Sequence, residues 1–433
     1  MTQPLGQYSH GHAPRLTNRW VVLALLVMIA LLNYTDRFLM SGLAQPIQQT
    51  FQISDTTMGL LMGPAFALLY TICTVPAARL ADTGSRVRII AGGCAMWSGF
   101  TVLSGMATTP WMLALARVGV GIGEAAFQAP AAALVAAYFP VEQRGKALAL
   151  LGTAIYFGQM AGFAGGPAIA EHFDWRTAFH AIGVAGLVVA VATVLIVSEP
   201  KGHMSKVQGT SQADAEPFFT AIRRIAATRS LWLITALMGL GTLSGMTFAM
   251  WGPSLFARSF DLNPKDAGAA IALSFGLPAL FGMLLFGALA DRLARRNPAA
   301  GLGLAAASLA AATTLVLGIV WSDNLATARM LAIPSGLLGS GWSVGVYAAL
   351  QYMLPDRLRA TGTGVVLLIT GILGSVIGPT VAGQLSDWVS TADASAHGLR
   401  VGLSVALPLA YLGVWAGWRA MGSLEADRAR LHA

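Results

Sequence analysis

Long apolar runs separated by short polar segments recur along nearly the whole chain. Each run holds about 20 residues or more, enough for a helix to cross roughly 30 Å of hydrocarbon. The pattern therefore predicts an all-α membrane protein with twelve spanning helices. The expected spans are residues 19–43, 56–80, 87–108, 110–138, 145–170, 177–198, 230–258, 266–290, 299–321, 325–353, 361–386 and 396–419.

The composition agrees with membrane residence. Of the 433 residues, 55% are hydrophobic and only 11% are charged, whereas a soluble chain typically carries about 25% charged residues. The first apolar run is not followed by a small-residue cleavage site, so we interpret it as a retained span. Residues 1–18 are then expected to form a short tail.

The net charge of +8 is explained by topology. With both termini placed in the cytoplasm, 20 of the 27 Lys and Arg fall in cytoplasmic loops or tails and five in external loops. This asymmetry is typical of that orientation and of contact with anionic lipid headgroups. The basic balance gives no indication of nucleic-acid binding.

The sequence predicts neither a cofactor nor a metal site. The two cysteines, Cys73 and Cys94, both lie within predicted spans, where a free thiol usually packs as a small apolar group. The Gly-x-Gly pairs lie inside predicted helices rather than in a strand-to-helix loop, so they do not indicate a nucleotide site.

A polar segment divides the chain into two halves. Residues 199–229 break the apolar pattern, and residues 217–229 are expected to form a short basic amphipathic helix at the membrane surface. The expected organisation is therefore a bundle at 19–198, a linker at 199–229, a second bundle at 230–420 and a tail at 421–433.

The two halves share features at a nearly constant offset of 207 to 215 residues. Gly59 is matched by Gly268, Asp82 reappears as Asp291, and the Asp-Trp pair at 174–175 recurs at 387–388. Such self-similarity predicts two six-helix bundles that are related by a parallel repeat.

Four charged residues lie inside apolar spans of the first half: Asp36, Arg37, Arg117 and Glu124. A charge at the bilayer centre costs at least roughly 2.5 to 3.5 kcal/mol, so such residues usually face a protein interior or a water-filled path. Arg117 and Glu124 are seven residues apart, which places them on one helix face about 10.5 Å apart. The glycines between them leave that face open to a partner helix or a ligand.

The four charges sum to zero, and they suit either structural ion pairs or proton coupling. In the second interpretation Asp36 and Glu124 exchange protons, while Arg37 and Arg117 are their partners and receive an anionic headgroup. The matching spans of the second half carry no charge at this depth. An asymmetric cavity is expected, with helix packing as the alternative for each aromatic residue. The lining candidates are Tyr34, Phe127, Tyr156, Ser244, Thr247, Trp251, Trp342 and Tyr347.

Residues 78–88 (ARLADTGSRVR) and 287–296 (GALADRLARR) resemble the cytoplasmic motif G-x-x-x-D-R-x-G-R-R of the major facilitator superfamily. The second copy is nearly complete, while the first departs from the pattern at Ala78, Thr83 and Ser85. The resemblance implies two six-helix bundles and a charge cluster that holds a cytoplasmic gate shut. The implied gate residues are Asp82, Arg86, Arg144, Glu199, Asp291, Arg292 and Arg295.

Residues 33–38 (NYTDRF) and 117–125 (RVGVGIGEA) together resemble the Spinster family of lysolipid and sphingolipid transporters, in a bacterial form. This resemblance implies a monomeric, proton-coupled transporter of an anionic amphiphile in a bacterial inner membrane, working by alternating access. Two alternatives remain open: a proton symporter of small organic anions, and a lipid sensor or scramblase without coupling. No motif indicates an enzyme.

Overall fold

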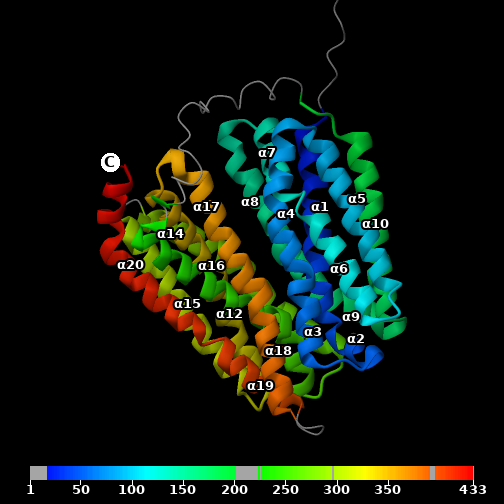
Figure 1. Cartoon of the computed structure of the whole chain (residues 1–433). Coiled ribbons are helices and arrows are strands. Elements are labelled where there is room, and N and C mark those ends of the chain that lie inside the picture. Colours follow the sequence, from blue (N-terminus) through cyan, green and yellow to red (C-terminus); the bar gives the residue numbers. More distant parts are fainter. Residues whose placement is uncertain (1–16, 201–222, 225, 295–296, 391–394, 433) are drawn as a thin grey trace, which may run out of the picture.

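The computed structural model describes residues 17–200, 223–224, 226–294, 297–390 and 395–432, which fold almost entirely into helices (Figure 1). The helices of the first half are α1 (Arg19–Gly42), α2 (Ala44–Phe51), α3 (Asp55–Met62), α4 (Pro64–Thr83), α5 (Arg86–Gly105), α6 (Pro110–Glu124), α7 (Gln128–Tyr138), α8 (Val141–Met160), η1 (Ala161–Gly165), α9 (Gly166–His172) and α10 (Trp175–Ile196).

The second half repeats the pattern after the linker. Its helices are α12 (Arg229–Ser259), α13 (Pro264–Ile271), η4 (Ala272–Gly276), α14 (Leu277–Ala294), α15 (Pro298–Val320), α16 (Leu325–Met353), α17 (Asp356–Gly371), η5 (Ile372–Ile377), α18 (Gly378–Val389), α19 (Ser395–Ala406) and α20 (Leu409–His432). Most of the amphipathic helix expected at 217–229 lies outside the described residues.

Within the described residues, eleven helical stretches are long and apolar enough to cross a membrane. The remaining predicted span corresponds to α16, which has 29 residues and is therefore about 43 Å long. Ser335, Ser340 and Ser343 near its middle make α16 less apolar than the others. The prediction of an all-α membrane protein with two six-helix bundles is confirmed. Of the twelve predicted spans, eleven are long and apolar enough to cross a membrane by composition, and α16 is the exception.

The last helix is longer than the sequence predicted. Residues 421–432 continue α20 instead of forming a separate tail, because this segment packs against the second half. Leu424 and Leu431 are buried there, and the Asp427 carboxylate accepts hydrogen bonds from the backbone N–H and the hydroxyl of Ser230 at 2.8 and 2.6 Å.

Local geometry shows the parallel repeat directly. Gln52 and Asp261, 209 positions apart, are the two non-glycine residues of the described chain with positive φ, at 51° and 49°. Two residues after each, Ser54 and Asn263 cap the next helix by accepting a bond from a backbone N–H three positions on. The turn from the first to the second span of each half is therefore built in the same way.

Several spans of the described chain are interrupted along their length, and four of them lie at the seam between the halves. The second span breaks at Gly63, where α3 ends and Pro64 begins α4, while π-helical turns η1, η4 and η5 interrupt the fifth, eighth and eleventh spans. These spans meet across the seam between the halves. A Cβ on Gly268 would overlap the Phe163 carbonyl, and one on Gly63 would lie 2.9 Å from the Ser375 carbonyl oxygen. Glycine is needed at these close approaches.

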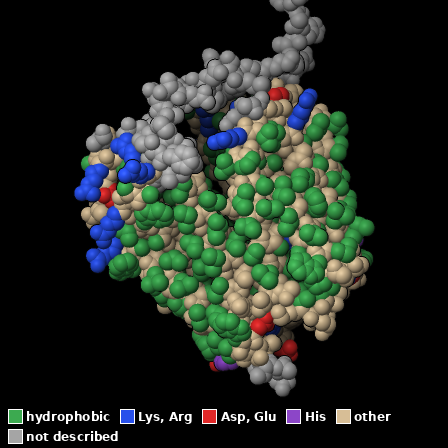
Figure 2. Space-filling view, in the orientation of Figure 1, with side chains coloured by type: hydrophobic (Ala, Val, Ile, Leu, Met, Phe, Trp, Pro, Cys, Tyr) green, Lys and Arg blue, Asp and Glu red, His purple; other side chains and the backbone are tan. Residues whose placement is uncertain are grey.

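The two halves meet at one end of the molecule and separate at the other (Figure 1). At the closed end, α3 packs against α18, η1 against α13, and α1 against α12. At the open end, where α10 and α20 finish, a cleft lies between the halves (Figure 2). The fold thus places a cavity between two bundles with access from one side.

Candidate functional site

The four buried charges of the first half form two ion pairs between α1 and α6. Arg117 Nη1 lies 2.8 Å from Asp36 Oδ2, and Arg37 Nη2 lies 2.8 Å from Glu124 Oε2. Two neighbouring residues on α1 therefore bind two residues that are two turns apart on α6. The pairs cross-link the first and fourth spans near the middle of the bundle.

The glycines between Arg117 and Glu124 serve helix packing. A Cβ on Gly121 would lie 2.4 Å from the Phe66 carbonyl oxygen, and a Cβ on Gly123 would lie 2.6 Å from the Trp97 backbone nitrogen. Both distances are too short for any side chain, so α6 needs glycine to approach α4 and α5. The sequence left open whether the helix face between Arg117 and Glu124 receives a partner helix or a ligand. In the structure, α4 and α5 pack against the glycines of this face.

The four charges differ in their exposure and in their hydrogen bonds. Asp36 and Glu124 are fully buried at the side chain, Arg117 is 1% exposed, and Arg37 is 14% exposed. Asp36 uses both oxygens, because Oδ1 accepts from the Thr101 hydroxyl at 2.8 Å. Glu124 Oε1 and the Nε atoms of both arginines have no partner. One carboxylate is therefore satisfied, and the other has a free oxygen.

Aromatic rings surround the partly exposed arginine. The Arg37 guanidinium carbon lies 5.1, 4.8 and 4.6 Å from the ring centres of Tyr34, Phe66 and Tyr70, within the range of cation–π attraction. The Tyr34 hydroxyl accepts a hydrogen bond from Gln128 Nε2 at 2.8 Å. Three helices, α1, α4 and α7, thus position this end of the site.

Sequence reasoning missed Phe66, Tyr70 and Thr101. Phe66 and Tyr70 are four residues apart, and this spacing places them on one helix face, where they stack with ring centres 5.4 Å apart. An aromatic pair at that spacing is also common in a core, so it gave no specific signal. A lone Thr in an apolar span is equally uninformative.

The expected cavity-lining residues fall into two groups. Tyr347 is 43% exposed, Tyr34 is partly exposed, and Tyr156 lies beside Ser340 of the other half. The others are buried among helices in this conformation, where Trp251 donates to the Pro379 carbonyl oxygen at 2.9 Å. These buried candidates are Phe127, Ser244, Thr247, Trp251 and Trp342.

A polar network joins the halves at the closed end. Arg258 binds both oxygens of Asp55, at 2.6 and 2.7 Å, and Gln48 and Ser386 donate to the same carboxylate. Asp387 of the second half in turn accepts from the backbone N–H of Asp55 at 3.0 Å, at the N-terminus of α3. Each half therefore holds a carboxylate of the other. The sequence analysis did not predict this network. Acidic residues are common in the first turn of a helix, where they stabilise its N-terminus, so Asp55 gave no specific signal.

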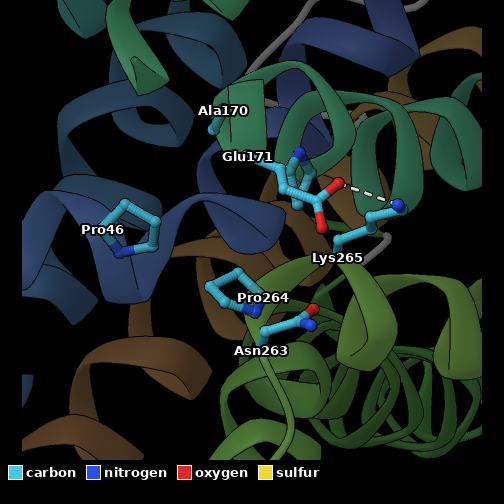
Figure 3. Close-up of a pocket in the computed structure, with 7 residues that line it drawn as sticks. Pro46, Ala170, Glu171, Asn263, Pro264 and Lys265 are labelled. Carbon is cyan, nitrogen blue, oxygen red and sulfur yellow. Dashed lines mark hydrogen bonds and ion pairs between the residues drawn. The ribbon is translucent and has the colours of Figure 1, made fainter. Parts of the chain in front are cut away.

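A second contact lies beside this network at the seam. Lys265 of α13 donates to Glu171 of α9 at 2.8 Å, across the two halves (Figure 3). The pair borders a cavity of about 140 Å³ that Pro46, Asn263 and Pro264 also line. Both charged side chains are more than a third exposed, so this pair contributes less than the buried one.

At the open end, those residues of the expected gate whose side chains the structure describes have separate contacts. Glu199 accepts from the Ser85 hydroxyl at 2.7 Å and from the Val87 backbone N–H at 3.0 Å, so it caps the start of α5. Arg144 Nε donates to the Phe139 carbonyl oxygen at 3.0 Å. Arg86 is partly buried and Arg292 is exposed. The side chains of Asp82, Asp291 and Arg295 lie outside the described part of the structure.

Two apolar helical bundles with a cleft that opens at one end, and two buried ion pairs inside the first bundle, are typical of a membrane transporter. Residues 26–379 match the model of the Major Facilitator Superfamily. The chain belongs to this superfamily. Its members are transporters rather than enzymes, and the described residues contain no group of His, Cys, Asp or Glu arranged to hold a metal ion.

Individual relatives extend this assignment. The chain is 30% identical to a protein named MFS-type efflux pump from Mycolicibacterium smegmatis, over 99% of both chains. It is 29% identical to Protein spinster of Drosophila melanogaster, over 89% of this chain and 66% of that protein. It superimposes with a TM-score of 0.83 on a bacterial homologue of the human lysosomal transporter Spinster in an inward-facing, unoccupied conformation, with 25% identity over 96% and 99% of the chains.

Proposed function

We propose that this protein is a proton-coupled secondary transporter of an anionic single-chain lipid, of the lysophospholipid or sphingolipid type. One observation carries the proposal: Glu124 is fully buried and binds Arg37 through a single oxygen, while its other oxygen has no partner. Arg37 is also the most exposed of the four central charges. The proton site and the headgroup site are therefore joined in one ion pair.

Glu124 is the better proton site of the two carboxylates. A buried oxygen without a donor is costly, and a proton on Glu124 would relieve that cost. Asp36 has donors on both oxygens, from Thr101 and Arg117, so protonation there disrupts existing bonds. We assign the main proton exchange to Glu124 and a supporting role to Asp36.

Arg37 is the better headgroup receptor of the two arginines. Its guanidinium is partly exposed, whereas Arg117 is 1% exposed at the side chain and fixed on Asp36. Protonation of Glu124 removes the carboxylate that holds Arg37, which leaves the guanidinium available to a phosphate or carboxylate group. Proton and anion therefore favour each other's binding, which by linkage supports cotransport.

The second half suits the apolar part of the substrate. Tyr347 of α16 is 43% exposed and belongs to the half whose matching spans carry no charge at this depth. An acyl chain gains about 0.8 kcal/mol for each buried CH₂ group. The likeness to Spinster proteins supports the same substrate class.

The cycle we propose is a rocking of the two bundles around this site. With the termini in the cytoplasm, as the positive-inside asymmetry supports, the open end faces the cytoplasm of a bacterial cell. The Asp55 and Asp387 network then closes the external side. In the opposite state that network separates, and the cluster around Asp82 and Asp291 closes the cytoplasmic side.

The test is transport in proteoliposomes with an imposed pH gradient. Fluorescent lysophosphatidylglycerol is the probe, and the variants are Glu124→Gln and the matched control Glu142→Gln, an exposed acid on α8. We expect the gradient to drive accumulation in the wild type and the control, while Glu124→Gln exchanges the probe without accumulating it. Equal lipid movement with and without a gradient in the wild type would indicate a scramblase.

A second candidate is proton-driven efflux of an amphiphile. The 30% identity to a protein named an efflux pump, over 99% of both chains, favours it. Reversing the imposed gradient separates the two: cotransport moves the lipid toward the side to which protons flow, and antiport moves it the other way. A short-chain carboxylate that stabilises the purified protein more than the lysolipid does would instead favour a small organic anion.

A further inference from the structure

Phe66 contacts both buried ion pairs. Its ring centre lies 4.8 Å from the guanidinium carbon of Arg37 and 5.1 Å from that of Arg117. The side chain is 4% exposed and belongs to α4, whereas both ion pairs join α1 to α6. An aromatic ring attracts a cation at this distance, and the attraction is larger where water is excluded. One ring thus lies within cation–π distance of two like charges.

The surroundings fix the ring closely. Tyr70 stacks on it, with the two ring planes 20° apart. On the backbone side, the absence of a side chain at Gly121 lets α6 pack directly against the Phe66 carbonyl. The ring therefore has little freedom to move relative to the two arginines.

The arrangement raises the question of what keeps the two pairs distinct. Arg117 and Glu124 share one face of α6, and Asp36, Arg37 and Arg117 all act electrostatically on Glu124. An exchange of partners, with Arg117 shared by both carboxylates, would preserve net neutrality. It would also leave Arg37 free whether or not Glu124 carries a proton.

We propose that Phe66 is a positioning residue that keeps Arg37 on Glu124 and Arg117 on Asp36, so that release of Arg37 requires protonation of Glu124. This inference rests on the proposed function and adds a residue to it. Without the ring, the lipid still binds and crosses, but its movement no longer depends on protons. Phe66 therefore determines coupling rather than binding.

The charged and titratable groups that face this unit come from three helices. Asp36, Arg37 and Tyr34 lie on α1, Tyr70 on α4, and Arg117 and Glu124 on α6. The neutral Thr101 of α5 completes the shell through its bond to Asp36. None of these groups is changed in the test, so a change in coupling is attributable to the ring.

The test compares Phe66→Leu and Phe66→Met, which remove the ring, with Phe66→Tyr, which keeps it. Methionine preserves most of the buried volume of phenylalanine. If Phe66→Leu does not fold, Phe66→Met therefore still tests whether loss of the ring lowers coupling. The matched control is Phe179→Leu, a fully buried phenylalanine of α10 that packs on Trp175. For each variant the readout is the ratio of gradient-driven accumulation to exchange of fluorescent lysophosphatidylglycerol.

We expect the ratio to fall at least about fivefold without the ring and to stay within about twofold of wild type in Phe66→Tyr and Phe179→Leu. An unchanged ratio in both Phe66→Leu and Phe66→Met would overturn the inference while the proposed function stands. A wild type without gradient-driven accumulation would instead refute the proposed function.

A second readout needs no substrate. Spin labels at Gln49→Cys and Ser395→Cys, both exposed at the closed end of opposite halves, report the opening of that end by their distance. The two native cysteines are replaced by serine. We expect this distance distribution to vary with pH in the wild type and in Phe66→Tyr, and to lose most of that dependence in Phe66→Met. A dependence retained in Phe66→Met contradicts the inference.

Discussion

Asp55 of the first half and Arg258 of the second half form a two-bond ion pair at the closed end, with Nη2 2.6 Å from Oδ1 and Nη1 2.7 Å from Oδ2. Both side chains are at most 12% exposed. Arginine and carboxylate match each other in this planar geometry, which makes such pairs stronger than single contacts. The pair thus stabilises the state in which the closed end is shut.

Arg258→Gln should shift the protein toward the state that is open at this end. Removal of one partner from a buried pair leaves the other charge unpaired, which costs about 3–5 kcal/mol. We expect the open population to rise at least about tenfold, measured by the spin-label distances at Gln49→Cys and Ser395→Cys. Arg400→Gln is the control, because Arg400 pairs with the 92% exposed Asp323, and it should change the population by less than about twofold.

Asp387→Asn should act on the same equilibrium through a different contact. Asp387 accepts from the backbone N–H groups of Asp55 and Thr56 at 3.0 and 2.7 Å, so it caps α3 across the seam. Loss of a cap typically costs about 0.5–2 kcal/mol. We expect a smaller opening than in Arg258→Gln, by the same distance measurement. An effect as small as that of Arg400→Gln would show that the cap does not hold the seam.

Gly121→Ala should destabilise the fold. Its Cβ would lie 2.4 Å from the Phe66 carbonyl oxygen, and a backbone atom cannot rotate away. Overpacking of this kind costs about 1–3 kcal/mol, so the melting temperature of the purified protein should fall. Gly145→Ala is the matched control, since nothing lies within 4 Å of its added Cβ. Equal melting temperatures in both variants would contradict the close approach of α6 and α4.

Thr101→Val should weaken the support of Asp36. The Thr101 hydroxyl donates to Asp36 Oδ1 at 2.8 Å, and valine leaves this buried oxygen without a donor, at a cost of about 1–3 kcal/mol. Thr101→Ser keeps the hydroxyl. We expect the melting temperature of Thr101→Val to lie at least about 3 °C below that of Thr101→Ser. If the two variants melt together, the hydroxyl does not support Asp36.

The sequence was sufficient for the fold and for the central charges, for physical reasons. The length of an apolar run directly indicates a membrane span. The repeat is visible in the sequence as the match of Gly59 with Gly268, and the structure shows the same offset of 209 residues between the positive-φ residues Gln52 and Asp261. A charge in an apolar run is conspicuous because it is costly, which is why Asp36 and Glu124 were found. Their roles remain predictions.

The same reasoning could not find the residues whose importance depends on position alone. Phe66 is one of many aromatic residues in apolar spans, and its place beside Arg37 and Arg117 follows from how α4 packs on α6. Asp55 and Arg258 lie about 200 positions apart at the ends of helices, where charges are ordinary. The exposure of the two arginines also required the structure, because spacing alone does not show that the Arg37 side chain is 14% exposed and that of Arg117 only 1%.

The most direct measurement of the central claim is proton uptake when the ligand binds. Lysophosphatidylglycerol is added to purified protein in weakly buffered detergent, and the released or absorbed protons are followed with a pH-sensitive dye. The account predicts uptake of up to about one proton per bound ligand in the wild type and in Glu142→Gln, and none in Glu124→Gln. Ligand binding without proton uptake, or equal uptake in Glu124→Gln, would contradict the claim that Glu124 and Arg37 link the proton to the lipid.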